Sequence, residues 1–89
     1  MDREVINLKR YDIVKVSWTD PTSIDEWSSK DEVLAYLPHQ IVTYGILIGE
    51  TPTHYITASN LDLVSEDVSC CMIIPKACLT KPIEVIHSG

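Results

Sequence analysis

The C-terminal third of the chain constrains the fold more than any other part of the sequence. Residues 68–74 read Val-Ser-Cys-Cys-Met-Ile-Ile, an apolar run typical of a strand, and residues 81–86 form a second short strand-like segment. The segment from Pro75 to Cys78 separates the two and predicts a one-turn break. Small five-stranded barrels close with a single tight turn before the last strand. The pattern therefore predicts a barrel, although it names no ligand.

Three more strands are predicted upstream. Apolar and polar residues alternate from Tyr11 to Trp18, as in a strand that is buried on one face. Residues 40–49 form a long run rich in β-branched side chains, with Gly45 in its middle, where we expect a sharp bend or a bulge. A hairpin connection follows, and residues 54–59 form the returning strand. These segments complete a set of five strands.

One helix is predicted, at residues 28–37. Ser29 and Glu32 have the spacing of a capping box, and Asp31 adds negative charge to the first turn. Pro38 ends the helix because proline cannot continue it. We expect a short helix inserted in a long connection between strands.

The length of 89 residues fits one domain with a modest core. We expect an all-β fold: a small five-stranded barrel with one short helical insertion. Residues 1–10 are expected to form an N-terminal arm, and residues 11–89 the single barrel domain. A small core favours association into a homo-oligomer, with residues 68–74 and 54–59 as the expected strand-to-strand seam.

The chain is acidic, with 13 acidic and 7 basic residues and a formal net charge of −6. Such a chain repels polyphosphate at long range, so we expect no binding to duplex DNA. The sequence contains no apolar run long enough to span a membrane, so no membrane partner is expected. An odd number of cysteines without framework spacing favours reduced thiols and a cytoplasmic location.

The cysteines and histidines lack the spacing of a metal site. Cys70 and Cys71 are adjacent in a predicted strand, so their side chains face opposite sides and cannot easily bind one tetrahedral ion. A thiol nucleophile would need a neighbouring base. Cys71 near His54 or His87 is one such pair, although a strand cysteine is more often a small buried hydrophobe. We expect no metal, no cofactor and no enzymatic activity.

The stretch from Trp18 to Trp27 is the best candidate for a ligand site. Two large aromatic side chains bracket a polar loop that contains Asp20 and Ser23. A tryptophan can stack on a base, and the polar groups can bind base edges or a ribose. Lys76, in the turn before the last strand, could contact a phosphate. The alternative interpretation is structural: the tryptophans pack, and the lysine is solvated.

The order and spacing of several segments between residues 11 and 86 carry a resemblance: Val14-Lys-Val-Ser-Trp18-Thr-Asp20, Ser23, Trp27, Val42-Thr-Tyr-Gly45-Ile-Leu-Ile and Ile73-Ile-Pro75-Lys76-Ala-Cys78-Leu. In these segments the chain resembles a family of small bacteriophage-encoded proteins of hypothetical function. Its barrel pattern also resembles Sm-like and SH3-like small β-barrels. That resemblance implies subunits joined into rings by strand pairing, with ligands in loops that face the pore or lie between subunits. The chain departs from the RNA-binding Sm pattern at Ala77, where an Arg-Gly pair would be expected.

Two functions remain open from the sequence. The first is non-enzymatic binding of a nucleotide-type ligand or short single-stranded RNA, for example to sequester a signalling nucleotide in the cytoplasm of a phage's host. Its expected contacts are Trp18, Asp20, Ser23, Trp27 and Lys76. The second is a structural or adaptor role, in which the protein binds a phage or host protein through a strand edge. A concave polar and aromatic site would favour the first function, and an apolar patch or an unpaired edge would favour the second.

Overall fold

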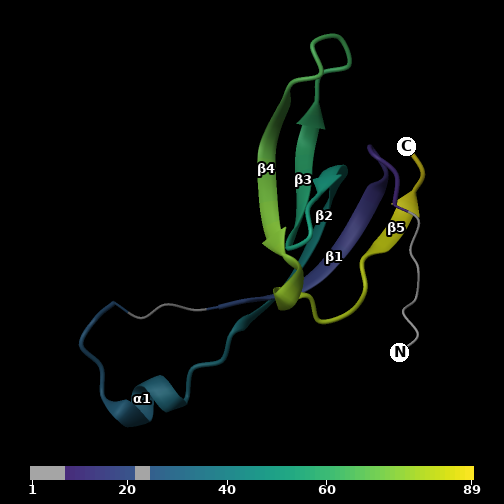
Figure 1. Ribbon diagram of the computed structural model, residues 1–89. Coiled ribbons are helices and arrows are strands. Elements are labelled where there is room, and N and C mark those ends of the chain that lie inside the picture. Colours follow the sequence, from purple (N-terminus) through teal and green to yellow (C-terminus); the bar gives the residue numbers. More distant parts are fainter. Residues whose placement is uncertain (1–7, 22–24) are drawn as a thin grey trace.

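The computed structural model describes residues 8–21 and 25–89, and these residues form an all-β structure built on one sheet (Figure 1). The predicted all-β class and the single short helix are confirmed. The elements, in chain order, are β1 (Ile13–Asp20), α1 (Lys30–Leu34), β2 (His39–Glu50), β3 (His54–Leu61), β4 (Val68–Pro75), the 3₁₀ turn η1 (Lys76–Cys78) and β5 (Glu84–His87).

The five strands lie in the order β4-β3-β2-β1-β5, and every neighbouring pair is antiparallel. Among the described residues β4 and β5 do not pair with each other, so the sheet is open and the expected barrel closure is not confirmed. β3 lies between β2 and β4 and uses both of its sides. The expectation that residues 54–59 offer a strand edge for self-association is therefore wrong, whereas β4 does lie at an edge.

The core lies against one face of β1. Val14 and Val16 are fully buried and Trp18 is 9% exposed, which confirms the predicted alternation on that side. The same cluster contains Leu47 of β2 and Ile74 of β4. The core therefore reaches from the middle of the sheet to edge strand β4, which contributes only Ile74 to the buried cluster.

The bulge that was one of the two expectations for Gly45 lies further along β2. The register shift between β2 and β3 falls between Leu47 and Gly49, so the bulge lies beyond Gly45. A Cβ added at Gly45 would lie 3.0 Å from the Cβ of Thr57 on β3. Gly45 therefore allows the close approach of two strands, which is a second common reason for glycine within a strand.

The insertion between β1 and β2 projects away from the sheet as an arm (Figure 1). This arm consists of residues 25–38, all of which are exposed. Ser29 caps α1 as predicted, because its side chain accepts a hydrogen bond from the backbone N–H of Glu32. The helix ends at Leu34, earlier than predicted. A short helix that buries no residue has little tertiary packing to extend it.

In the described part of the chain no helix is long and apolar enough to cross a membrane. Most of the predicted N-terminal arm, residues 1–7, lies outside the described residues.

Candidate binding edge

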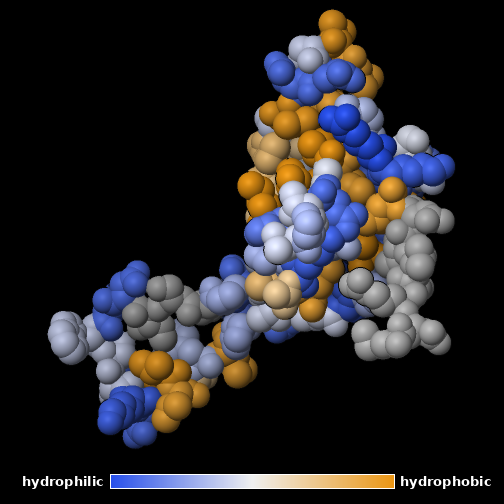
Figure 2. Space-filling model, viewed as in Figure 1, coloured by the Kyte–Doolittle hydropathy of each residue, from blue (hydrophilic) through white to orange (hydrophobic). Residues whose placement is uncertain are grey.

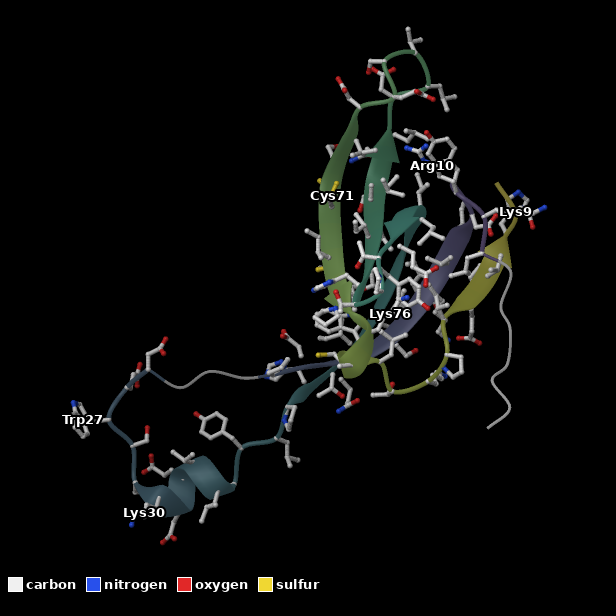
Figure 3. All side chains as sticks on the ribbon, in the orientation of Figure 1. Lys9, Arg10, Trp27, Lys30, Cys71 and Lys76 are labelled. Carbon is white, nitrogen blue, oxygen red and sulfur yellow. The ribbon has the colours of Figure 1, made fainter. Side chains whose placement is uncertain are left out.

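The two tryptophans that bracket the predicted ligand loop have different surroundings. Trp18 belongs to the core, and its indole N–H donates a hydrogen bond of 2.9 Å to the Thr43 hydroxyl on β2. Trp27 is fully exposed and lies at the far end of the arm (Figure 3). A buried and bonded indole offers no face for stacking, so of the two tryptophans it is Trp27 that presents a free aromatic surface.

The other predicted contacts are spread over separate parts of the molecule. Asp20 is exposed at the end of β1, opposite His39, and Ser23 lies outside the described residues. Lys76 lies at the base of the sheet, far from Trp27 in the view of Figure 3. Among the described residues, the structure does not bring this set into one concave site.

Lys76 already has two partners near the β2–β3 hairpin. Its ammonium group forms an ion pair with the Glu50 carboxylate and lies 4.9 Å from the ring centroid of Tyr55. Its backbone N–H donates a 2.8 Å hydrogen bond to the Thr53 carbonyl. These contacts hold η1 against the hairpin and neutralise the lysine charge locally.

The three cysteines are free thiols. Cys70 and Cys71 are exposed on β4, and Cys78 is half-buried in η1. The interpretation of the first two as buried hydrophobes is wrong, because edge strand β4 leaves them in solvent. In the described part of the chain, no group of three or more histidine, cysteine or acidic side chains could hold a metal ion.

A shallow hollow lies beside the loop that joins β3 to β4. The Asp62 carboxylate on its wall accepts hydrogen bonds from the backbone N–H groups of Val64 and Ser65, and these bonds hold the pKa of Asp62 below its usual value. An ionised carboxylate at this position repels phosphate. The lining residues are Asn60, Leu61, Asp62, Asp67, Val68 and Ser69.

The β4 strand is the most exposed apolar element of the sheet. It spans 8 residues, and none of them carries a charge. Only Ile74 is buried, while Ile73 is 63% exposed and Met72 is also exposed. Figure 2 shows apolar side chains gathered along this edge and at the tip of the adjoining loop, where Leu63 and Val64 are exposed.

The backbone of β4 also has unpaired hydrogen-bonding groups. The bond from the Lys76 N–H to the Thr53 carbonyl follows the β3–β4 register, so Met72 and Ile74 bond to β3. This pattern ends at Cys70, which has a φ of 55° and no paired residue on β3; beyond it the Asp62 N–H bonds to the Asp67 carbonyl in the same register. Antiparallel ladders alternate, so the backbone groups of Cys71 and Ile73 point away from the sheet. Such a row of donors and acceptors is a template for pairing with another strand.

The sequence interpretation placed residues 68–74 at a seam but did not single out these outward-facing residues. The absence of any charge over β4 is a signal that could have identified them, since exposed edges usually carry a charge or an internal proline. No protein-family model matches this chain, and no curated protein or solved structure matches it either. Its function is therefore inferred from its own residues.

Proposed function

We propose that this protein is a non-enzymatic binding protein that takes up an extended segment of another protein chain along the β4 edge. The observation that carries the proposal is the combination of an uncharged strand of 8 residues and a row of outward-directed backbone groups. Strand addition obtains affinity from main-chain hydrogen bonds and specificity from the side chains beside them.

The side chains beside the edge suit a β-branched or apolar partner strand. Ile73 and Cys71 lie on one face of β4, and Met72 lies on the other; all three are exposed. An added strand would cover side chains on both faces. Burial of apolar surface contributes roughly 25 cal/mol per Å².

The arm supplies a second surface for the same partner. Its exposed apolar side chains form no part of the core cluster, which is unusual for so many large residues in one short segment. They are Trp27, Val33, Leu34, Tyr36 and Leu37. A projecting apolar segment of this kind fits a role in holding a protein partner rather than in catalysis.

We also propose which kind of all-β fold this is. The antiparallel sheet of five strands, with η1 between its two edge strands, is the arrangement on which we propose an Sm-like or SH3-like small barrel. The proposed bacteriophage origin rests on the sequence resemblance alone. Members of that class join through strand edges, which agrees with a cytoplasmic homo-oligomer. Light scattering over a range of protein concentrations tests the oligomeric part.

Binding of a nucleotide-type ligand or short single-stranded RNA is a second candidate, and the exposed indole of Trp27 favours it. Base stacking is worth roughly 1–3 kcal/mol per base by alanine substitution. Trp27→Ala should then weaken binding by about five- to a hundredfold, in calorimetry against cyclic and linear nucleotides and a short single-stranded RNA. No heat from any of them with the wild-type protein would exclude this candidate.

The main proposal can be tested with a synthetic peptide of alternating threonine and valine, titrated into isotope-labelled protein and followed by NMR. The expected result is that the amide signals of Cys71 and Ile73 shift first. The matched control is the same peptide with alternate backbone nitrogens methylated, which cannot complete the ladder and should shift nothing. Shifts confined to β5 or the arm, or no shifts at all, would contradict the proposal.

A further inference from the structure

We propose that Cys70 and Cys71 form a two-thiol redox site, which closes to a disulfide between the two adjacent residues and thereby turns off the β4 edge. Its reactant is a low-molecular-weight disulfide of the class of oxidised glutathione. The effect on the edge rests on the proposed function, because it is a regulation of that same site. The redox chemistry of the two thiols does not depend on it.

Both thiols of the pair are accessible to a reactant in solvent. Cys70 and Cys71 are exposed on β4, and both are free. Figure 3 shows Cys71 well separated from Lys76 at the η1 end of the strand. The oxidation of a thiol follows its exposure, and redox-sensing thiols often lie next to a second, resolving cysteine. Cys78 differs from the pair, because it is half-buried and packs against the core.

The backbone at Cys70 has already left the geometry of a regular strand. Its φ is 55° and it has no paired residue on β3, whereas Ser69 and Cys71 on either side are paired with Asn60 and Ala58. Adjacent side chains of a regular strand face opposite sides, so joining them would require the ladder to be broken. At Cys70 the ladder is already interrupted, and ring closure there breaks no existing pair of that residue.

Cysteine is an unfavourable residue for the backbone conformation at position 70. Glycine adopts a positive φ freely, and asparagine and aspartate tolerate it better than most other residues. The side chain of Cys70 is exposed and lies outside the core cluster, so the packing of the fold does not require it. The thiol at this position is therefore explained by its chemistry rather than by its contribution to the fold.

The oxidation takes place in two exchange steps. The thiolate of one cysteine attacks the S–S bond of oxidised glutathione, which forms a mixed disulfide and releases one glutathione thiolate. The thiolate of the neighbouring cysteine then attacks the protein sulfur of the mixed disulfide, and the second glutathione leaves as the ring closes. In sum, the two protein thiols give up two protons and two electrons, and one oxidised glutathione becomes two reduced ones.

The closed ring should be easy to reduce. Adjacent Cα atoms lie about 3.8 Å apart across a trans peptide bond, which is less than the roughly 4.4–6.8 Å that disulfides usually span. Strained and exposed disulfides are the labile and regulatory ones, whereas structural disulfides resist reduction. We therefore expect an excess of reduced glutathione to reopen the ring, so that the site acts as a reversible switch.

Ring closure changes the part of β4 that a partner strand would use. The outward-directed backbone groups of the edge belong to Cys71 and Ile73, and the ring holds Cys71 away from the extended conformation that a ladder needs. An incoming strand then loses both the donor and the acceptor of Cys71. Each such hydrogen bond contributes roughly a factor of five to affinity, so the oxidised protein should bind an extended peptide at least about tenfold more weakly.

The redox site is tested with three full-length variants that all carry Cys78→Ala. The first keeps both adjacent cysteines, the second also carries Cys70→Ser, and the third carries Cys71→Ser instead. Each is incubated with oxidised glutathione and measured by intact mass, and circular dichroism verifies that it is folded. We expect the first variant to lose two hydrogen atoms and to retain no glutathione, whereas each single-cysteine variant retains one glutathione. A glutathione adduct or a covalent dimer as the main product of the first variant would overturn the inference.

A fourth variant, with Cys70→Gly and Cys78→Ala, tests whether the thiol at position 70 serves the fold. The positive φ favours glycine, so its thermal midpoint should equal or exceed that of the Cys78→Ala protein. A lower midpoint would show that Cys70 has a structural role, and would overturn the argument that its chemistry explains it.

The effect on the edge is tested by titrating the threonine–valine peptide into the reduced and the oxidised Cys78→Ala protein. The matched control lacks all three thiols, and exposure to oxidised glutathione should leave its affinity unchanged. Ring closure without a loss of affinity would overturn the regulatory role. If no ring forms while the reduced protein still binds the peptide, the inference is wrong and the proposed function stands. If the ring forms but neither form binds the peptide, the proposed function is wrong and the redox site remains.

Discussion

The two edges of the sheet differ in how well they are protected from pairing with other chains. β5 is short, begins with a charged residue and follows Pro82, and its register against β1 shifts between Ile13 and Val14. Short length, charge, proline and irregular register are the features that natural edge strands use to prevent association. β4 is twice as long, carries no charge and has no proline before its last residue, Pro75, although its pairing with β3 is interrupted at Cys70. This difference is the reason why the proposed partner site is placed on β4 and not on β5.

The chain after β5 is also held in place. The Asp12 carboxylate accepts a 2.9 Å hydrogen bond from the backbone N–H of Gly89 and another from that of Lys9. These bonds hold the pKa of Asp12 below its usual value, the Gly89 bond most strongly. The segment after β5 is thus fixed by contacts within the chain, whereas the outer side of β4 is the proposed binding edge.

The largest expected effect is on the free energy of unfolding, and it should differ between a buried and an exposed residue of β4. Ile74 is 0% exposed, so Ile74→Ala should lower the free energy of unfolding by about 2–5 kcal/mol through lost burial and a cavity. Ile73→Ala is the matched control on the next residue. Under dilute conditions it should change stability by less than about 1 kcal/mol, because Ile73 is mostly exposed. Urea unfolding measures both, and equal losses would contradict the assignment of faces.

A charge placed on each edge compares the two strands directly. Ile73→Glu should weaken association by at least about tenfold, or about 1.4 kcal/mol, because two carboxylates would enter an apolar seam. Ile86→Glu on β5, where Ile86 is exposed to a similar extent, should leave association unchanged. Sedimentation equilibrium measures both dissociation constants. A larger loss of association in the β5 variant would show that β5, and not β4, is the associating edge.

A smaller effect is expected from the Asp12 contacts. The folded-state pKa of Asp12 is lowered, so the carboxylate stabilises the fold above its ordinary value of 3.8, and this contribution is lost as the pH falls below that value. Asp12→Asn should lower the thermal midpoint at pH 7 and reduce the loss of stability on acidification. Thermal melts from pH 7 to pH 2 test this. A variant with the same acid dependence as the wild-type protein would show that Asp12 does not act in this way.

The smallest effect is expected from the ion pair that protects β5. Lys15 and Glu84 are both partly exposed and 3.9 Å apart, so solvent screens their attraction. Glu84→Gln should change the free energy of unfolding by less than about 0.5 kcal/mol, and salt should reduce that difference further. Thermal melts in low and high salt measure it. A loss above 1 kcal/mol would show that the pair matters more to the edge than its exposure implies.

Much of the fold could be predicted because the signals are local. The alternation in β1, the cap at Ser29 and the break after Pro75 each arise from neighbouring residues, and the structure confirms them. The place of β3 in the middle of the sheet and the bulge after Leu47 could not be predicted, since both depend on which strands pair. The same holds for Trp18, whose indole is bonded by Thr43 from a distant strand. The binding edge was only partly predictable, because strand order decides which segment remains unpaired.

The comparison of the two edges is tested most directly by hydrogen exchange at low and high protein concentration. We predict that the amides of Cys71 and Ile73 become strongly protected as concentration rises, because each donates into a new ladder. Protection of the β5 amides, from Glu84 to His87, should stay unchanged over the same range. Protection that rises at β5 and not at β4, or at neither edge at any concentration, would contradict the account.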